Sequence, residues 1–144
     1  MIKKFNRKKI LFICTQNSAR SQMAEGLVNY FFNKEFEAFS AGTNPSKVNP
    51  YAIKVMKEIG INISNHRSKH VSEFYGTEFD LVVTVCDNAK KVCPFFPGAK
   101  KLVHNSFKDP VEVVGSDESI LATFRGVRDD IFKWLSDYFF KANP

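Results

Sequence analysis

FICTQNSARS, residues 12–21, is the segment from which the fold of this 144-residue chain is best predicted. The apolar run at 10–13 enters it, and apolar residues recur at helical spacing after it, from Met23 to Phe32. A short apolar run followed by an amphipathic pattern is typical of a buried strand that turns into a helix. We therefore expect a strand-to-helix turn here.

The side chains of this turn favour binding of a tetrahedral oxyanion. A loop that enters a helix N-terminus directs several backbone N–H groups to one point, and the helix dipole adds positive charge there. Arg20 adds a planar fork of donors, and the same positive field is expected to lower the pKa of Cys14. Ser21 can donate a hydrogen bond to the Cys14 sulfur. A buried structural cysteine beside a surface arginine is the simpler alternative. It does not explain why a strand, a loop, an arginine, a hydroxyl group and a helix start occur together here.

The spacing of Cys14, Arg20 and Ser21 after the first strand resembles the phosphate-binding loop of the low-molecular-weight tyrosine phosphatase superfamily. Within that superfamily, residues 17–26 (NSARSQMAEG) are similar to the thioredoxin-coupled arsenate reductases, and the resemblance extends over nearly the whole chain. It implies that the anion is bound by consecutive loop residues, namely Thr15, Gln16, Asn17, Ser18, Ala19, Arg20 and Ser21. Gln16 and Ala19 replace a glycine and a second loop cysteine of the phosphatases, which weakens the phosphatase interpretation.

Length and composition indicate one domain, residues 1–144, with one core. The chain is 44% hydrophobic and 25% charged, without an apolar run of membrane-spanning length. The basic residues 3–9 lead into the turn, so we do not expect a signal peptide. The net charge of +6 is scattered rather than arranged as a nucleic-acid module. We expect a cytoplasmic monomer that binds neither nucleic acid nor membrane.

Strand-like and helix-like segments alternate along the chain. Strands are expected at 9–13, 35–41, 81–85 and 101–103, and helices at 21–33, 50–59 and from 116–118 almost to the end. Residues 61–69 are expected to form a surface connection, and 87–94 a brief helix or a mobile loop. Gln22 and Glu25 are placed on the polar face of the first helix. This order predicts an α/β fold with a central parallel, doubly wound sheet and a ligand at the carboxyl ends of its strands.

The other two cysteines lie at separations that match the arsenate reductases. Cys86 follows Cys14 by 72 residues and is followed after seven by Cys93. The resemblance implies a relay in which Cys14 attacks arsenic, Cys86 attacks Cys14 and releases arsenite, and Cys93 attacks Cys86. The resulting disulfide would be reduced by thioredoxin. Cys86 also fits a core strand, whereas Cys93 lies in a polar segment and is expected at the surface.

Asp109-Pro110 matches the position of the general acid in the superfamily. Removing an oxygen from an oxyanion requires a proton donor, which Asp109 would supply. An Asp-Pro turn is also common in any loop. Val111 stands where the phosphatases usually carry an aromatic residue, which favours a small inorganic anion as substrate.

Some of the reductases bind potassium through positions that correspond here to Asn17, Glu25 and Ser40, together with an aspartate. This chain carries Lys69 at the aspartate position, and its ammonium group would replace the cation and pair with Glu25. A solvated loop lysine is the alternative. We expect no metal, because the three histidines, His66, His70 and His104, lack the spacing of zinc ligands.

We therefore predict an arsenate reductase of arsenic detoxification, without a bound cofactor and with thioredoxin as electron donor. Phosphate and sulfate are expected to compete with arsenate. A low-molecular-weight protein tyrosine phosphatase is the second hypothesis, and a non-catalytic anion-binding or redox-sensing protein is the third. Replacing Cys86 by serine separates them, because only a reductase needs that thiol for turnover.

Overall fold

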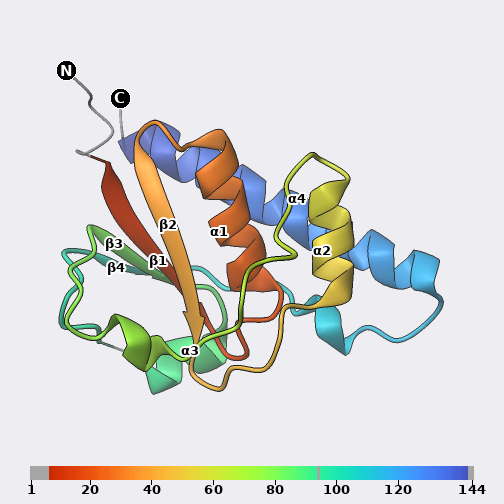
Figure 1. Ribbon diagram of the computed structural model, residues 1–144, viewed down its shortest axis with the longest axis horizontal. Coiled ribbons are helices and arrows are strands. Elements are labelled where there is room, and N and C mark those ends of the chain that lie inside the picture. The colour runs from red at the N-terminus through yellow and green to blue at the C-terminus, as the bar shows by residue number, and fades with distance from the viewer. Residues whose placement is uncertain (1–6, 94, 143–144) are drawn as a thin grey trace.

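A computed structural model describes residues 7–93 and 95–142 of the chain. Its four-stranded, all-parallel sheet has the order β2-β1-β3-β4 (Figure 1). The strands are β1 (Lys8–Cys14), β2 (Phe36–Gly42), β3 (Leu81–Thr84) and β4 (Leu102–His104). Helices flank this sheet, which confirms the predicted α/β fold class. The basic leader at 3–9 lies partly outside the described residues.

In the described part of the chain, four α-helices and two short 3₁₀ helices lie between these strands or follow the last of them. They are α1 (Arg20–Phe31), α2 (Pro50–Lys57), η2 (Val71–Phe74), α3 (Asp87–Val92), η3 (Pro110–Glu112) and α4 (Asp117–Ala142). Within the described residues, no helix is both long and apolar enough to span a membrane. The predicted segments agree closely with these bounds, and the uncertain segment at 87–94 forms a helix over six residues. Pro94, expected to end it, lies outside the described residues.

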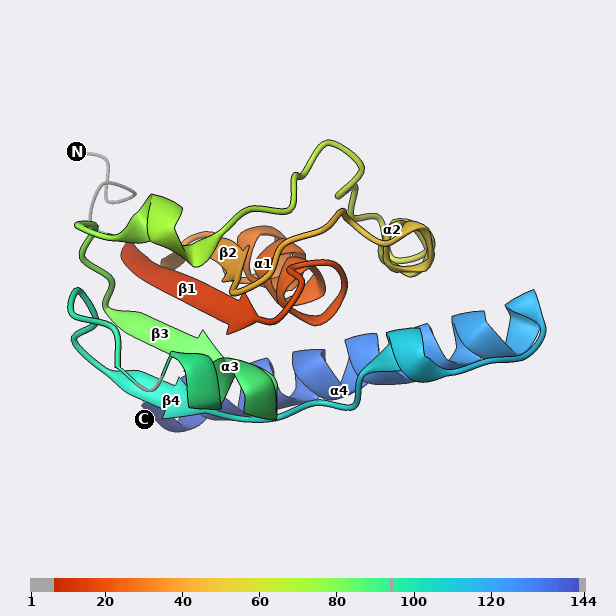
Figure 2. The same cartoon turned by 90° about the horizontal axis from the view of Figure 1, so that it is seen from below.

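Aromatic side chains attach the sheet to the elements on its two sides. Phe36 of β2 stacks on Phe139 of α4, with ring centroids 4.3 Å apart. Phe39, three residues further along the strand, points to the opposite face and meets Phe74 of η2 at 5.8 Å. Figure 2 accordingly shows η2 and α4 on opposite sides of the strands. Both faces of the central strand β1 are therefore covered, and its residues 10–14 are buried.

Two expectations about polar segments are wrong. The connection at 61–69 is not wholly on the surface, because Ile61 and Ile63 belong to the core. Gly26 of α1 makes room for them: a Cβ atom there would lie 3.0 Å from the Ile63 side chain. Gln22 is completely buried rather than on a polar helix face, because the chain around the strand-to-helix turn covers that side of α1.

The parallel arrangement brings the ends of β1 and β3 together. Ile13 is paired with Thr84, so Cys14 and Cys86 leave neighbouring strands at the same edge of the sheet. This is the edge at which parallel α/β sheets bind ligands. The sheet therefore brings together two cysteines that are distant in sequence.

Candidate active site

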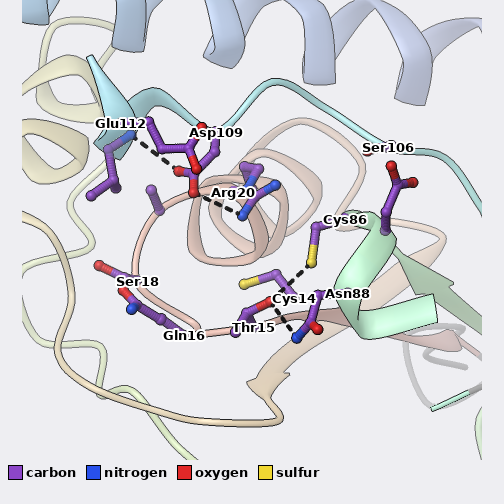
Figure 3. A pocket seen from close by; sticks show the side chains of 13 residues that line it. Cys14, Thr15, Gln16, Ser18, Arg20, Cys86, Asn88, Ser106, Asp109 and Glu112 are labelled. Atoms are coloured by element: carbon purple, nitrogen blue, oxygen red, sulfur yellow. Dashed lines mark hydrogen bonds and ion pairs between the residues drawn. The ribbon is translucent and has the colours of Figure 1, made fainter. Parts of the chain in front are cut away.

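A cavity of about 530 Å³ opens at the carboxyl ends of β1 and β3 (Figure 3). Its lining comes from the strand-to-helix turn, the start of α3 and the loop before α4: Cys14, Thr15, Gln16, Ser18, Ala19, Arg20, Cys86, Asp87, Asn88, Ser106, Asp109, Val111 and Glu112. Figure 3 shows the side chains of Cys14, Cys86 and Arg20 converging on this space. The structure thus brings together four of the five predicted catalytic residues, with Asp109 as the fourth and Cys93 outside the lining.

Asn17 supports the turn from below the cavity. It adopts a left-handed backbone conformation with φ of 50°, which asparagine tolerates better than most residues. Its side-chain nitrogen donates to Ser21 Oγ at 2.8 Å and to Ser40 Oγ at 3.0 Å. Its side-chain oxygen accepts from Gln22 Nε2 at 3.0 Å and from the Lys69 backbone N–H at 3.1 Å. One buried amide therefore ties the turn to α1, to β2 and to the loop at 69.

Gln22 and His66 complete this support and were not predicted as site residues. Gln22 Nε2 also donates to the carbonyl oxygens of Asn17 and Arg67, at 3.2 and 3.0 Å. His66 Nδ1 lies 3.0 Å from Gln22 Oε1, which fixes the orientation of the amide. The sequence offered one signal for Gln22, because it belongs to the family-like stretch at 17–26. His66 is brought to the turn only by the fold.

The backbone of the turn is bonded to the segment that follows β2. The N–H groups of residues 43, 44, 46 and 49 donate to carbonyl oxygens of residues 14, 15, 16 and 18, at 2.7–3.1 Å. Gly42 makes this close approach feasible, since a Cβ atom there would lie 2.5 Å from the Thr15 carbonyl oxygen. With these carbonyls occupied, the turn is held in one conformation.

Cys14 is buried, although it lines the cavity. Its sulfur lies 2.8 Å from Ser21 Oγ and accepts the Asn17 backbone N–H at 3.2 Å. Burial raises the pKa of the Cys14 thiol above its ordinary value, while the Ser21 hydrogen bonds, the charge of Arg20 and the Asn17 N–H lower it. The sequence predicted a lowered pKa. That prediction differs from the structure because it included the positive groups but not the complete burial of the sulfur.

Arg20 connects the strand-to-helix turn to the loop that carries Asp109. Its guanidinium donates to the carbonyl oxygen of Phe107 at 3.2 Å and lies 3.4 Å from Asp109 Oδ2. Asp109 is the N-cap of η3 and accepts the Val111 N–H at 3.1 Å through its other oxygen. Asp109 is thereby placed at the rim of the cavity, with one carboxylate oxygen toward Arg20 (Figure 3).

Cys86 and Cys93 stand at the two ends of α3. Cys86 Sγ accepts the Ala89 N–H at 3.4 Å and lies 3.3 Å from Thr15 Oγ1, inside the cavity. Cys93 is also buried, only 7% exposed, and its thiol lies 3.7 Å from the Phe95 carbonyl oxygen. The expectation of a surface position for Cys93 is therefore wrong. Cys93 follows the last residue of α3 and is buried, although the residues before it, Lys90, Lys91 and Val92, are exposed.

Glu25, Ser40 and Lys69 meet behind the turn, at the region compared with a potassium site. Ser40 Oγ donates to Glu25 Oε1 at 2.6 Å, and Lys69 Nζ lies 3.9 Å from the same oxygen and 3.2 Å from the Arg67 carbonyl. The Lys69 side chain is 13% exposed, so it is not a solvated loop residue. Among the described residues, no three His, Cys, Asp or Glu side chains are grouped to hold a metal ion.

Residues 9–139 match the low molecular weight phosphotyrosine protein phosphatase family. A protein of Halalkalibacterium halodurans named arsenate reductase is 46% identical over 133 residues, which cover 92% of this chain and 96% of that protein.

Solved structures agree with this match. An arsenate reductase in the phosphate binding state superposes with a TM-score of 0.79 at 30% identity, covering 93% of this chain and 98% of its own. The thioredoxin-dependent arsenate reductase of Corynebacterium glutamicum has a TM-score of 0.61 at 27% identity, covering 90% and 62% of the two chains. The chain therefore belongs to the low molecular weight phosphotyrosine protein phosphatase family, and within it is similar to arsenate reductases.

Proposed function

We propose that this protein reduces arsenate to arsenite through Cys14, Cys86 and Cys93. The observation that carries the proposal is the convergence of Cys14, Cys86 and Arg20 on one cavity. A phosphatase needs only the first of the two thiols, whereas reduction needs a second. The names of the relatives support the same activity, and the relative with bound phosphate supports a site for tetrahedral oxyanions.

The first step forms a bond between Cys14 and arsenic. The Cys14 thiolate attacks arsenate held by the turn amides and by Arg20, and one arsenate oxygen leaves as water after protonation. Asp109 is the proposed proton donor, because it stands at the rim of the cavity beside Arg20. Arsenic remains As(V) in the resulting adduct. The Ser21 hydroxyl, 2.8 Å from the Cys14 sulfur, stabilises the thiolate that begins the step.

The next two steps move two electrons to arsenic. The Cys86 thiolate attacks the Cys14 sulfur, and the electron pair of the sulfur–arsenic bond leaves with arsenic as arsenite, As(III). The Cys93 thiolate then attacks the Cys86 sulfur of the Cys14–Cys86 disulfide and releases the Cys14 thiolate. The enzyme ends with a Cys86–Cys93 disulfide. Two thiols have supplied the two electrons, and an external dithiol must restore them.

We propose thioredoxin as that dithiol, and the cytoplasm, where thioredoxin keeps thiols reduced, as the compartment. The thioredoxin-dependent relative supports this choice. So does the surface near Cys93, where Val92 and Phe95 are exposed although apolar. Exposed apolar groups of this kind are typical of protein contact surfaces. Thioredoxin bound there would meet the disulfide as it forms.

The test couples arsenate reduction to NADPH oxidation through thioredoxin and thioredoxin reductase. The wild-type protein is expected to oxidise NADPH in proportion to the arsenate added. Cys86→Ser and Cys93→Ser are each expected to lose at least about a thousandfold in kcat, since a thiol of the relay is missing. Ser64→Ala, which changes an exposed serine away from the cavity, is the control. Arsenate reduction that persists in Cys86→Ser would refute the relay.

Phosphatase activity is the second candidate, and the family membership favours it. Hydrolysis of a phosphate ester needs Cys14, Arg20 and Asp109 but neither of the other thiols. We expect Cys86→Ser to keep whatever hydrolysis of p-nitrophenyl phosphate the wild type shows. A protein that hydrolyses this ester well and shows no arsenate-dependent NADPH oxidation would be assigned as a phosphatase.

A further inference from the structure

Three side chains outside the strand-to-helix turn connect β3, β4 and the start of α3. Thr84 Oγ1 lies 2.8 Å from His104 Nδ1, and His104 Nε2 lies 3.1 Å from Asp87 Oδ1. A neutral His104 satisfies both contacts: the Thr84 hydroxyl donates to Nδ1, and Nε2–H donates to the Asp87 carboxylate. Thr84 is buried, so the histidine is fixed to the rigid sheet on one side and holds the helix on the other.

The contacts of α3 are concentrated at the end that bears Cys86. Cys86 precedes Asp87 directly, its sulfur accepts the Ala89 N–H, and Thr15 Oγ1 lies beside it. Asn88 Nδ2 donates to the same Thr15 hydroxyl at 3.1 Å. At the other end, Lys90, Lys91 and Val92 are exposed. The first turn of this short helix is therefore fastened by side chains, whereas its second half is held by little besides the burial of Cys93.

The relay requires one end of this helix to move. Seven helical steps separate Cys86 from Cys93, about 10 Å at a rise of roughly 1.5 Å per residue. A disulfide needs Cα atoms about 4.4–6.8 Å apart. Because the Cys86 end is fastened to the sheet, the end that moves is the one that carries Cys93.

We propose that His104 is a positioning residue of the cysteine relay. Through Asp87 it keeps Cys86 directed at Cys14 while the rest of α3 unwinds to bring Cys93 in. It exchanges no electrons and does not touch the substrate. The inference rests on the proposed reductase function. Its consequence is kinetic: without the contact, the first turn unwinds together with the second, and Cys86 spends less time in a position to attack Cys14.

The experiment follows formation of the Cys86–Cys93 disulfide in a single turnover. Reduced protein is mixed with arsenate, quenched with an alkylating agent and analysed by mass spectrometry. His104→Ala and Asp87→Ala are each expected to slow disulfide formation about fivefold while the KM for arsenate stays within about twofold. Asp87→Asn keeps an acceptor oxygen for His104 and is expected to restore most of the rate. The double alanine variant is expected to be no slower than either single variant.

Asp137→Ala is the matched control, because it removes an exposed carboxylate that pairs with Lys133 at 3.1 Å on α4. A second readout is hydrogen exchange at the Ala89 amide of the reduced protein, which is expected to become faster in His104→Ala but not in the control. If His104→Ala does not fold, Asp87→Ala decides, since the Asp87 side chain is 78% exposed.

The outcomes separate the two proposals. A wild-type protein that forms no disulfide with arsenate would refute the reductase function itself. If the wild-type protein forms the disulfide, and His104→Ala and Asp87→Ala form it equally fast or faster, the reductase function stands. The positioning role of His104 is then overturned. Unequal effects of the two alanine variants that add in the double variant would also overturn it, because the residues would then act separately.

Discussion

The strand-to-helix turn after β1 and the segment after β3, which contains α3, leave adjacent parallel strands at the same edge of the sheet. The two regions are nevertheless built differently. In the turn, the polar residues Asn17, Ser21 and Gln22 are buried and bonded to one another. In α3, Ala89 is buried, and the polar residues Lys90 and Lys91 are exposed. In the proposed reductase, the first region keeps one geometry for an oxyanion and the second changes shape. Burial of polar side chains provides the rigidity, and their exposure permits the movement.

The two asparagines give the sharpest test of this difference. Asn17→Ala removes one buried hydrogen bond from each of the Ser21, Ser40 and Gln22 side chains and places alanine at a positive φ. We expect it to lower the free energy of unfolding by about 2–4 kcal/mol. Asn88→Ala removes one exposed hydrogen bond to Thr15 and is expected to cost less than about 0.5 kcal/mol. Urea unfolding of both variants measures the change in the free energy of unfolding. Equal changes in the two variants would contradict the difference in rigidity between the two regions.

Arg20→Lys tests whether the rigid turn needs a fork of donors or only a positive charge. Lysine keeps the charge but cannot contact two anion oxygens in a plane. We expect phosphate affinity to fall about tenfold to a hundredfold, with little change in stability. Isothermal titration with phosphate measures the affinity. Arg125→Lys, on α4 and paired with Glu58, is the control. Wild-type affinity in Arg20→Lys would show that a positive charge at this position is sufficient and that the fork of donors is not needed.

Redox-dependent exchange tests the mobile half of the comparison. We expect backbone amides between about Asp87 and Phe96 to exchange roughly tenfold faster in the oxidised protein than in the reduced protein, because the disulfide is incompatible with the helix. Amides of β1 should change little. Hydrogen exchange with mass spectrometry reads both regions at once. Equal protection of the segment in both redox states would remove the case for a moving redox segment.

The smallest expected effect concerns the Cys14 sulfur. The Ser21 side chain is the largest of the influences that lower the pKa of Cys14 against burial. Ser21→Ala removes it, so the pKa rises and a smaller fraction of Cys14 is thiolate at any pH below it. The pH profile of alkylation by iodoacetamide should move to higher pH. Ser64→Ala, which removes the hydroxyl of an exposed serine bonded to Asn62, is the control and should leave the profile unchanged. A profile that moved to lower pH in Ser21→Ala would contradict the role assigned to Ser21.

The local sequence pattern predicted the helices and strands, and within the site it predicted the strand-to-helix turn. The apolar run at 10–13 and the helical spacing after it gave β1, the turn and α1 because neighbouring residues dominate such structure. Cys93 is a residue whose position the local sequence pattern did not predict. Its neighbours are polar, and the surface position they suggested is wrong, because burial of a single side chain depends on what lies across from it in the fold.

The sequence by itself determined the parallel α/β class, the strand-to-helix turn and the family, since each depends on residues close together in the chain or on a family-like spacing. Only the tertiary structure decided which distant groups meet. It brought Cys86 beside Thr15, His66 beside Gln22 and His104 beside Asp87. Strand register and chain packing set these contacts, and neither is encoded in a local pattern.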